Sequence, residues 1–265
     1  MAKERLDAYM ARTGLAESRE KAQKLIMAGL VLVGTQRADK PSHPVKEGDE
    51  VHVKGQMAYV SRGGYKLKRA MDAFSLTLTD CVCADIGASS GGFTDCMLQH
   101  GARKVFAVDV GYGQLDYRLR SDPRVVVMER TNARYLSAEQ LGEPLDFASI
   151  DVSFISLHLI LPALLDCLKP QGRVAALIKP QFEAGKELVG KKGVVRDPAV
   201  HRMVIERVLE QARQMGYGVA GLDHSPIKGP EGNIEFLTLL VKGGPDTLAE
   251  GAAQDVVERA HASLK

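Results

Sequence analysis

Cysteine is scarce in this chain of 265 residues, and the four that occur lack the spacing of a metal site. There is no Cys-x-x-Cys pair, and no histidine lies near enough in the sequence to complete a zinc-binding pattern. The cysteines therefore predict buried, reduced thiols and no bound metal. They are Cys81, Cys83, Cys96 and Cys167.

Long apolar runs are also absent. The longest, residues 154–168, contains Pro162 and Asp166 and is shorter than the roughly 20 apolar residues that a membrane span needs. The N-terminal residues are charged and include no apolar stretch typical of a signal peptide. We therefore expect a core helix at 154–168, no membrane segment, and a cytoplasmic location.

Two common nucleotide-binding motifs are missing from the glycine-rich segment DIGASSGGFTD, residues 85–95. The pattern G-x-G-x-x-G is broken because residue 89 is serine, and no Gly-Lys-Ser/Thr ends the loop, which disfavours NAD and phosphate binding. What remains is a turn between an apolar run and a helical pattern. Its glycines, Gly87, Gly91 and Gly92, permit a ligand close to the backbone, and the helix-opening amides offer donors.

A second apolar run, residues 104–108, ends in Asp109, and an acid at this place suits the hydroxyls of a cofactor ribose. The loop and this acid together resemble the S-adenosylmethionine site of the Rossmann-like methyltransferases. An ordinary tight turn with a capping aspartate is the alternative.

Positive charge is concentrated at the front of the chain. Residues 1–69 contain 14 Lys and Arg against 8 Asp and Glu, a net of +6, whereas the whole chain is only +2. This local excess favours a polyanion-binding N-terminal part.

The first 55 residues have a pattern of their own. Leu6, Tyr9 and Met10 share a helical face, Ser18 can cap a second helix, and 31–33 and 51–53 indicate short strands. This segment resembles the S-four-type (S4) RNA-binding domain. That resemblance implies phosphate contacts to RNA, although a solvated helix surface would have a similar pattern. The residues concerned are Arg5, Arg19, Lys21, Lys24 and Lys40.

A basic junction follows, in which no acid occurs between Glu50 and Asp72. Gly63 and Gly64 permit a hinge, and a helix can begin at about Tyr65. The unbalanced charge favours a groove that admits RNA, with Arg62 and Lys68 as contacts, over a solvated linker. The cations of the junction are Lys54, Arg62, Lys66, Lys68 and Arg69.

From Cys81 onward, apolar runs alternate with helical patterns, as a doubly wound parallel α/β sheet requires. The sequence predicts strands at 82–86, 104–109, 125–129, 146–151, 173–179, 217–222 and 235–241. It predicts helices at 93–100, 114–119, 137–141, 156–168 and 198–215, and a C-terminal helix within 248–265. The seven strands resemble the class I methyltransferase sheet, whose last strand is antiparallel.

The predicted organisation has four parts. They are an α+β RNA-binding domain at 1–55, a basic linker and the start of the catalytic domain at 56–70, a methyltransferase domain at 71–245, and a C-terminal helix at 246–265.

Several ionisable residues lie where strands end. Because ligands bind at the carboxyl ends of parallel strands, we expect Asp109, Asp151 and Lys179 to meet there. An antiparallel last strand would bring Glu235 to the same edge, and Lys66 comes from the helix before the first strand. A lysine whose pKa is lowered by burial and a second ammonium could accept a hydroxyl proton, and positive charge would stabilise an alkoxide. A strand-end network of salt bridges is the alternative.

Eight short motifs stand out along the chain: YVSRGGYKL, DIGASSGGFTD, AVDVGYGQL, ERTNAR, DVSFISL, KPQFE, GVVRDP and GPEGNIEF. Together they resemble the TlyA family of ribosomal RNA ribose 2′-O-methyltransferases, which is related to the FtsJ/RrmJ type. The resemblance covers nearly the whole chain. It implies S-adenosylmethionine as cofactor, a cytidine 2′-oxygen as acceptor, and ribosomal RNA or a ribosomal subunit as partner.

The resemblance also implies site residues. The catalytic tetrad is Lys66, Asp151, Lys179 and Glu235, with Lys179 as base or alkoxide partner. The cofactor-binding residues are Asp85, Gly87, Ala88, Ser89, Ser90, Gly91, Gly92, Phe93, Thr94, Asp109, Asn132 and Asp151.

Two other functions stay open at this point. Members of this family have also been called hemolysins, but the chain has no signal peptide, spanning helix or strongly amphipathic basic helix that would favour a membrane-active protein. The second alternative is an RNA-binding assembly factor whose methyltransferase domain has no turnover.

Overall fold

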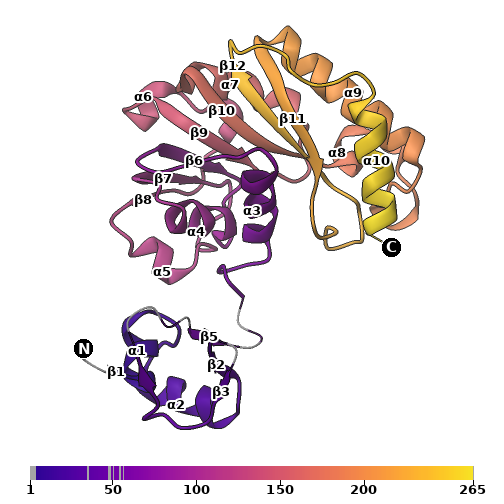
Figure 1. Ribbon diagram of the computed structural model, residues 1–265. Helices are drawn as coiled ribbons and strands as arrows, with labels where there is room; N and C mark the ends of the chain where they lie inside the picture. Colours follow the sequence, from indigo (N-terminus) through magenta and orange to yellow (C-terminus); the bar gives the residue numbers. More distant parts are fainter. Residues whose placement is uncertain are drawn as a thin grey trace. The chain divides into compact units, whose positions relative to one another are not determined.

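The computed structural model describes residues 4–34, 36–46, 49, 51–53, 55 and 57–264 (Figure 1). The chain divides into two compact units between Ala58 and Tyr59.

The N-terminal unit is a small α+β fold. Ser18 caps its second helix by accepting a hydrogen bond from the Lys21 amide, as the sequence predicts. Leu6, Met10 and Ile26 pack in its core. Its helices are α1 (Leu6–Arg12) and α2 (Arg19–Met27), and its strands are β1 (Glu4–Arg5), β2 (Val31–Val33), β3 (Gln36–Ala38), β4 (Pro44–Val45) and β5 (Val51–Val53).

Two small sheets complete this unit. β2 pairs with β3 and β5, and β1 pairs with β4, all antiparallel. The sequence predicts β2 and β5 but not the short strands β1, β3 and β4. Strands of two or three residues are too short to show alternation of apolar and polar side chains.

The second unit contains the predicted seven-stranded sheet. Its strand order is β11-β12-β10-β9-β6-β7-β8, and β12 is antiparallel to both neighbours while the other pairs are parallel. This confirms the α/β class I Rossmann-like methyltransferase architecture. The strands are β6 (Val82–Ile86), β7 (Lys104–Val108), β8 (Val125–Met128), β9 (Leu145–Ile150), β10 (Leu168–Ile178), β11 (Tyr217–His224) and β12 (Phe236–Lys242).

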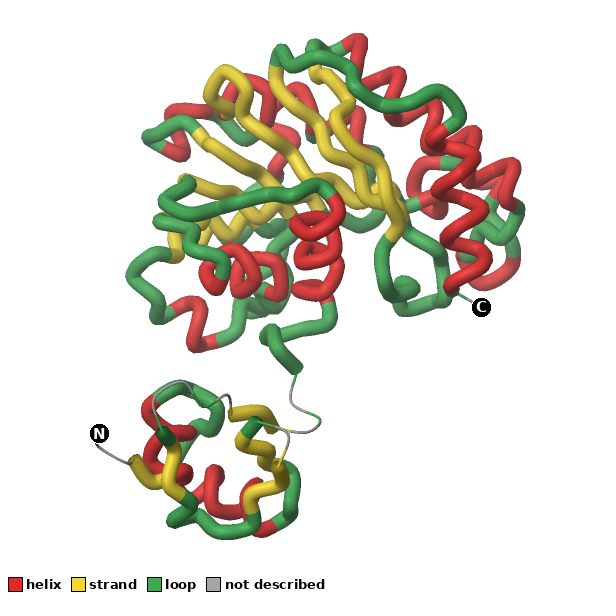
Figure 2. The backbone as a smooth tube through the Cα atoms, viewed as in Figure 1, coloured by secondary structure: helices red, strands yellow, loops and turns green. Residues whose placement is uncertain are grey.

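Helices cover both faces of this sheet (Figure 2). Leu67 of α3 and Met97 of α4 pack on one face, while Leu164 of α7, Val208 of α9 and Val257 of α10 pack on the other. The helices are α3 (Gly63–Ala73), α4 (Gly92–Gln99), α5 (Tyr117–Arg120), α6 (Ala138–Leu141), α7 (Leu161–Cys167), α8 (Pro180–Glu183), α9 (Pro198–Gln214) and α10 (Ala252–Ser263), with single 3₁₀ turns η1 (Ala133–Tyr135), η2 (Leu157–Leu159), η3 (Lys186–Leu188) and η4 (Lys191–Gly193).

Two sequence expectations need correction here. The helix predicted at 156–168 is instead a 3₁₀ turn, η2, followed by α7, because Pro162 occupies the first turn of the helix that begins at Leu161. Cys81 is only half-buried because it lies just before β6, whereas the other three cysteines are buried; all four are free thiols.

Within the described part of the chain, no helix has the length and apolar content to cross a membrane.

Candidate active site

Four side chains predicted from strand ends meet at the carboxyl edge of the sheet. Asp151 follows β9 and Lys179 follows β10, so the two parallel strands deliver them side by side. Glu235 directly precedes the antiparallel β12, which starts at the edge where its neighbours end. Lys66 reaches the same place from α3.

The four groups form a chain of alternating charge. Lys66 Nζ lies 2.6 Å from Glu235 Oε2 and 3.5 Å from Asp151 Oδ2. The other carboxylate oxygen of Asp151, Oδ1, lies 2.5 Å from Lys179 Nζ. Asp151 therefore bridges the two ammonium groups, and Glu235 anchors one end.

The four side chains of this chain differ in burial. The side chain of Glu235 is 1% exposed, those of Lys179 and Lys66 are 9% and 10% exposed, and that of Asp151 is 18% exposed. Two cations and two anions compensate one another, which makes their burial tolerable. Asp151 is the most exposed of the four side chains, and Glu235 is the most buried.

Lys66 does not have the lowered pKa that a lysine acting as a base requires. Burial alone lowers the pKa of Lys66, but the carboxylates of Asp151 and Glu235 outweigh it and raise that pKa above its ordinary value. Lys66 therefore stays protonated at neutral pH. This raised pKa suits a fixed cation at Lys66, whereas the base or alkoxide partner expected from the resemblance is Lys179.

The sequence interpretation missed the surroundings of Lys179. Its Nζ donates to Ser153 Oγ over 3.3 Å and lies 5.9 Å from the centre of the Phe182 ring. The Phe182 ring is 4.9 Å from that of Phe154, which is 90% exposed and has a left-handed φ of 64°. These residues lie in the motifs DVSFISL and KPQFE, but their neighbourhood depends on two strands meeting in space.

Glu183 was also missed, and it holds the segment after Asp151. Its buried carboxylate accepts hydrogen bonds from Ser156 Oγ at 2.5 Å and from the Leu157 amide at 2.8 Å. The loop that carries Ser153 and Phe154 is thereby tied to α8.

The glycine-rich loop contacts the backbone of Asp151. Gly87 has a φ of 86°, and a Cβ at this position would lie 2.5 Å from the Asp151 carbonyl oxygen. Ser89 has a φ of 49°, a left-handed conformation in the place of a dinucleotide-motif glycine. Gly91 likewise has a φ of 95°, and a Cβ there would collide with Leu119. The loop therefore brings bare backbone to within contact distance of the tetrad.

Asp85 lies beneath this loop rather than facing its open side. It is 1% exposed and accepts hydrogen bonds from the Thr94 amide at 2.8 Å, from Thr94 Oγ1 at 2.7 Å, and from Ser149 Oγ at 3.3 Å. Burial raises the pKa of Asp85 to about 7 despite these hydrogen bonds. Asp85, Thr94 and Phe93 are thus buried beneath the loop, and their contact with the cofactor stays a prediction.

Asp109 and its neighbours line a small cavity beside the loop. Asp109 Oδ2 accepts from the Ser89 amide at 2.8 Å, and Oδ1 accepts from the Gly111 amide at 2.7 Å. The cavity is lined by Ala88, Ser89, Ala107, Asp109, Gly111, Gln114, Leu115, Val127 and Glu129. A carboxylate, bare backbone and apolar side chains are the kinds of group that line nucleoside sites, so the lining matches the predicted cofactor in its chemistry.

Three other cofactor candidates, Ser90, Gly92 and Asn132, do not line this cavity. Asn132 is exposed, and its side chain accepts from the Arg134 amide at 3.1 Å as the cap of η1. Asn132 is not among the residues that line the cavity. Ser90 and Gly92 belong to the loop and the first turn of α4.

The predicted RNA contacts of the N-terminal unit are partly organised by an acid that the sequence interpretation passed over. Asp7 is fully buried, and its carboxylate lies 3.0 Å from Arg5 and 3.3 Å from Arg19, whose side chains are 51% and 57% exposed. Asp7 thus holds two guanidinium groups together. Lys21, Lys24 and Lys40 are exposed.

The basic junction is partly integrated into the second unit. Tyr59 is buried, and the Val60 amide donates to Asp95 Oδ2 at 2.8 Å. Arg62 is exposed, and Lys68 pairs with Asp72 at 2.5 Å one turn along α3. Lys54, the first cation of the junction, lies outside the described residues.

Comparison with known proteins agrees with these two units. The FtsJ-like methyltransferase family model matches residues 59–242, and the S4 domain model matches residues 4–51. The chain is 52% identical to the "Putative rRNA methyltransferase YqxC" of Bacillus subtilis (strain 168), over 99% of this chain and 96% of the relative. It is 43% identical to the "16S/23S rRNA (cytidine-2'-O)-methyltransferase TlyA" of Mycobacterium tuberculosis, over 97% of this chain and 96% of the relative.

A solved structure, described as a putative hemolysin from Streptococcus thermophilus, is also similar. It has a TM-score of 0.76 and 48% identity, and the match covers 99% of this chain and 97% of that one. With a family model that matches most of its length and relatives similar from end to end, this chain belongs to the FtsJ-like methyltransferase family and carries an S4 domain.

Proposed function

We propose that this protein transfers a methyl group from S-adenosylmethionine to a ribose 2′-hydroxyl of ribosomal RNA, with cytidine as the modified nucleoside. The observation that carries the proposal is the chain Glu235–Lys66–Asp151–Lys179 beside the glycine-rich loop. A relative named for cytidine 2′-O-methylation of 16S and 23S ribosomal RNA, similar along nearly the whole chain, supports the choice of acceptor.

The cofactor site in this proposal is the cavity at Asp109 together with the glycine-rich loop. Asp109 would hold the ribose hydroxyls, and Gly87 lets the loop pack against the Asp151 backbone. When bound, S-adenosylmethionine supplies a methyl group activated by its sulfonium. The carboxylate of Asp151 also places negative charge near that cation.

Lys179 is the residue that we assign to the acceptor hydroxyl. It is held by Asp151 and Ser153, and one of its three N–H groups is left to bind the 2′-oxygen. Once this N–H proton has left to solvent, the freed lone pair of Lys179 takes the hydroxyl proton as the 2′-oxygen bonds the methyl group, and the ammonium so restored stabilises that oxygen.

Lys66 has a different part because its raised pKa keeps it charged. Held by Glu235, it is a fixed cation beside Asp151 and does not act as the base. Glu235 in turn is a positioning residue, since it is almost fully buried and contacts Lys66.

The acceptor is tested by mapping 2′-O-methyl groups in ribosomal RNA from cells with and without the gene. The proposal predicts at least one methylated cytidine that disappears with the gene and returns on incubation of the purified protein with S-adenosylmethionine and unmodified ribosomal subunits. Identical maps, together with no transfer in vitro, would refute the proposed function.

A further inference from the structure

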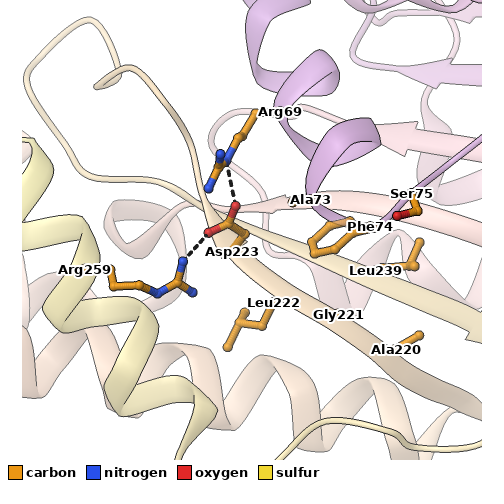
Figure 3. A pocket seen from close by; sticks show the side chains of 10 residues that line it. All are labelled: Arg69, Ala73, Phe74, Ser75, Ala220, Gly221, Leu222, Asp223, Leu239 and Arg259. Atoms are coloured by element: carbon orange, nitrogen blue, oxygen red, sulfur yellow. Dashed lines mark hydrogen bonds and ion pairs between the residues drawn. The ribbon is translucent and has the colours of Figure 1, made fainter.

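A groove of about 580 Å³ lies outside the site described so far, along the edge strand β11 of the seven-stranded sheet. Arg69 of α3 and Arg259 of α10 stand at its polar end, and Phe74, Leu222 and Leu239 contribute its apolar lining (Figure 3). The groove thus combines two cations with an apolar surface.

The two arginines are held by one buried carboxylate. Asp223 is 4% exposed, and its oxygens lie 2.7 Å from Arg69 Nε and 2.9 Å from Arg259 Nη1. Figure 3 shows the guanidinium groups approaching Asp223 from two sides. One carboxylate against two guanidinium groups leaves a net charge of +1.

Donors remain available on both arginines. Each guanidinium has five N–H groups in a fixed fork, and the described contacts use one of them on each residue, toward Asp223. The side chains of Arg69 and Arg259 are 41% and 53% exposed, so their outer edges face solvent. A pair of oriented, partly exposed guanidinium groups is suited to the oxygens of a phosphate.

The groove is next to the proposed active site. Arg69 lies three residues after Lys66 on α3, which places the two side chains on neighbouring turns of one face. On the other side, the Ser225 amide donates to the Glu235 carbonyl at 2.9 Å, and Asp223 is two residues before Ser225 on β11. The groove and the tetrad are therefore linked through one face of α3 and through the paired strands β11 and β12.

We propose that Arg69 and Arg259 bind a backbone phosphate of the substrate RNA next to the methylated nucleotide, with the apolar lining of the groove accommodating the adjoining sugar or base. This inference rests on the proposed function. Its contribution is to position the strand, since the arginines bind a phosphate outside the reacting atoms and read no sequence.

The test uses the full chain with the single substitutions Arg69→Gln and Arg259→Gln. The control is Arg213→Gln, because Arg213 also pairs with an aspartate, Asp246, but lies on α9 away from the groove. Binding is measured with unmodified ribosomal RNA and with ribosomal subunits at several salt concentrations, and methyl transfer is measured on the subunits.

Either groove substitution is expected to weaken RNA binding by about tenfold at low salt. Each should also reduce the slope of log affinity against log salt by about 0.7, since one single-stranded phosphate contact is lost. KM for RNA should rise with little change in kcat, while cofactor affinity and the behaviour of Arg213→Gln stay as in the unmodified protein.

Asp223→Asn tells phosphate binding by the two arginines apart from a purely structural role of their ion pairs with Asp223. It removes the bridge but keeps both cations, so we expect a lower melting temperature with RNA affinity equal to or above that of the unmodified protein. An unchanged salt slope in Arg69→Gln and Arg259→Gln would overturn the proposal. A defect seen with subunits but not with free RNA would assign the groove to a ribosomal protein and also overturn it.

If the unmodified protein methylates RNA while the arginine variants match it, the further inference fails and the proposed function stands. If the unmodified protein transfers no methyl group to any RNA, the proposed function fails by itself.

Discussion

At the scale of single residues, the site depends on close approach between the glycine-rich loop and the tetrad. Gly87 contacts the carbonyl of Asp151, and Asp151 bridges Lys66 and Lys179. Asp151 therefore couples the position of the glycine-rich loop, where the cofactor is predicted, to the positions of the other tetrad residues.

Gly87→Ala tests this coupling. The new Cβ would lie 2.5 Å from a backbone oxygen at a φ of 86°, so the loop must shift away from Asp151. We expect a loss of stability above the roughly 1 kcal/mol that a left-handed alanine costs, and cofactor affinity at least tenfold weaker by calorimetry. Gly142→Ala is the matched control, because Gly142 has a φ of 73° but open space around its Cβ position. Equal effects of both substitutions would show that the close approach at Gly87 has no importance for the cofactor.

The residues of the site differ in how far the sequence can predict them. Lys66, Asp151, Lys179 and Glu235 could be placed together because each is tied to a strand end or to a helix beside the first strand. The roles of Asp7 and Asp223 could not be predicted, because each depends on pairing with arginines that only the folded structure places beside it. Arg259 and Asp223 are 36 residues apart, and Arg69 and Asp223 are 154 apart.

At the scale of elements, α9 and α10 are joined by a histidine pair. His201 is fully buried, and its Nδ1 lies 2.9 Å from His261 Nε2, while its Nε2 lies 3.2 Å from the Val195 carbonyl oxygen. Burial lowers the pKa of His201 to about 4, and the neighbouring His261 adds to this effect. His201 is therefore neutral in the folded protein at pH values where it is protonated in the unfolded chain.

Because of this histidine pair, we expect the free energy of unfolding to be sensitive to acidic pH. His201 takes up a proton only on unfolding between pH 6.5 and about 4, so its contribution to the free energy of unfolding falls as pH drops through this range. At pH 5 the loss relative to pH 7 is about 2 kcal/mol. The raised pKa of Asp85 acts with the opposite sign in the same range, so the readout must be a difference between variants.

Denaturant unfolding at pH 7 and pH 5 measures that difference. His201→Gln should lose less stability on acidification than the unmodified protein, and the exposed His158→Gln should behave like the unmodified protein. If His201→Gln shows the same loss as the unmodified protein, the buried pair does not cause acid sensitivity.

Most elements of the second unit were predictable because their strands are short apolar runs bounded by turns or charged residues. β10 is the exception at its start, since it begins at Leu168 and continues through Lys169, Pro170, Gln171 and Gly172. A polar stretch of this kind predicts a loop. This stretch belongs to the strand because Leu168 pairs with Leu145 of β9, and the pairing register then shifts before Arg173. Such pairing is visible only in the folded sheet.

At the scale of the whole molecule, each unit has a core of its own, so their functions can be separated experimentally. The S4 unit buries Leu6, Met10 and Ile26, while the methyltransferase unit is built on two larger clusters on the faces of its sheet. Charge does not divide in the same way, because four of the cations behind the basic excess of residues 1–69 belong to the second unit: Arg62, Lys66, Lys68 and Arg69.

Deletion of residues 1–58 should therefore leave a folded methyltransferase unit. We expect cooperative thermal unfolding and retained cofactor binding, but RNA affinity at least tenfold weaker and a flatter salt dependence, because the phosphate contacts of the S4 unit are lost. Unchanged RNA affinity at moderate salt would mean that the S4 unit does not bind the RNA.

The alternating chain of Lys66, Asp151, Lys179 and Glu235 is the centre of this account, and Lys179→Ala tests it most directly. Lys169→Ala is the matched control, since Lys169 lies at the opposite end of β10 and pairs with Asp146 at 2.5 Å, as Lys179 pairs with Asp151. Methyl transfer to unmodified ribosomal subunits should fall by at least about 100-fold in Lys179→Ala, with cofactor affinity nearly unchanged, and should stay normal in Lys169→Ala. Normal transfer by Lys179→Ala would contradict the account.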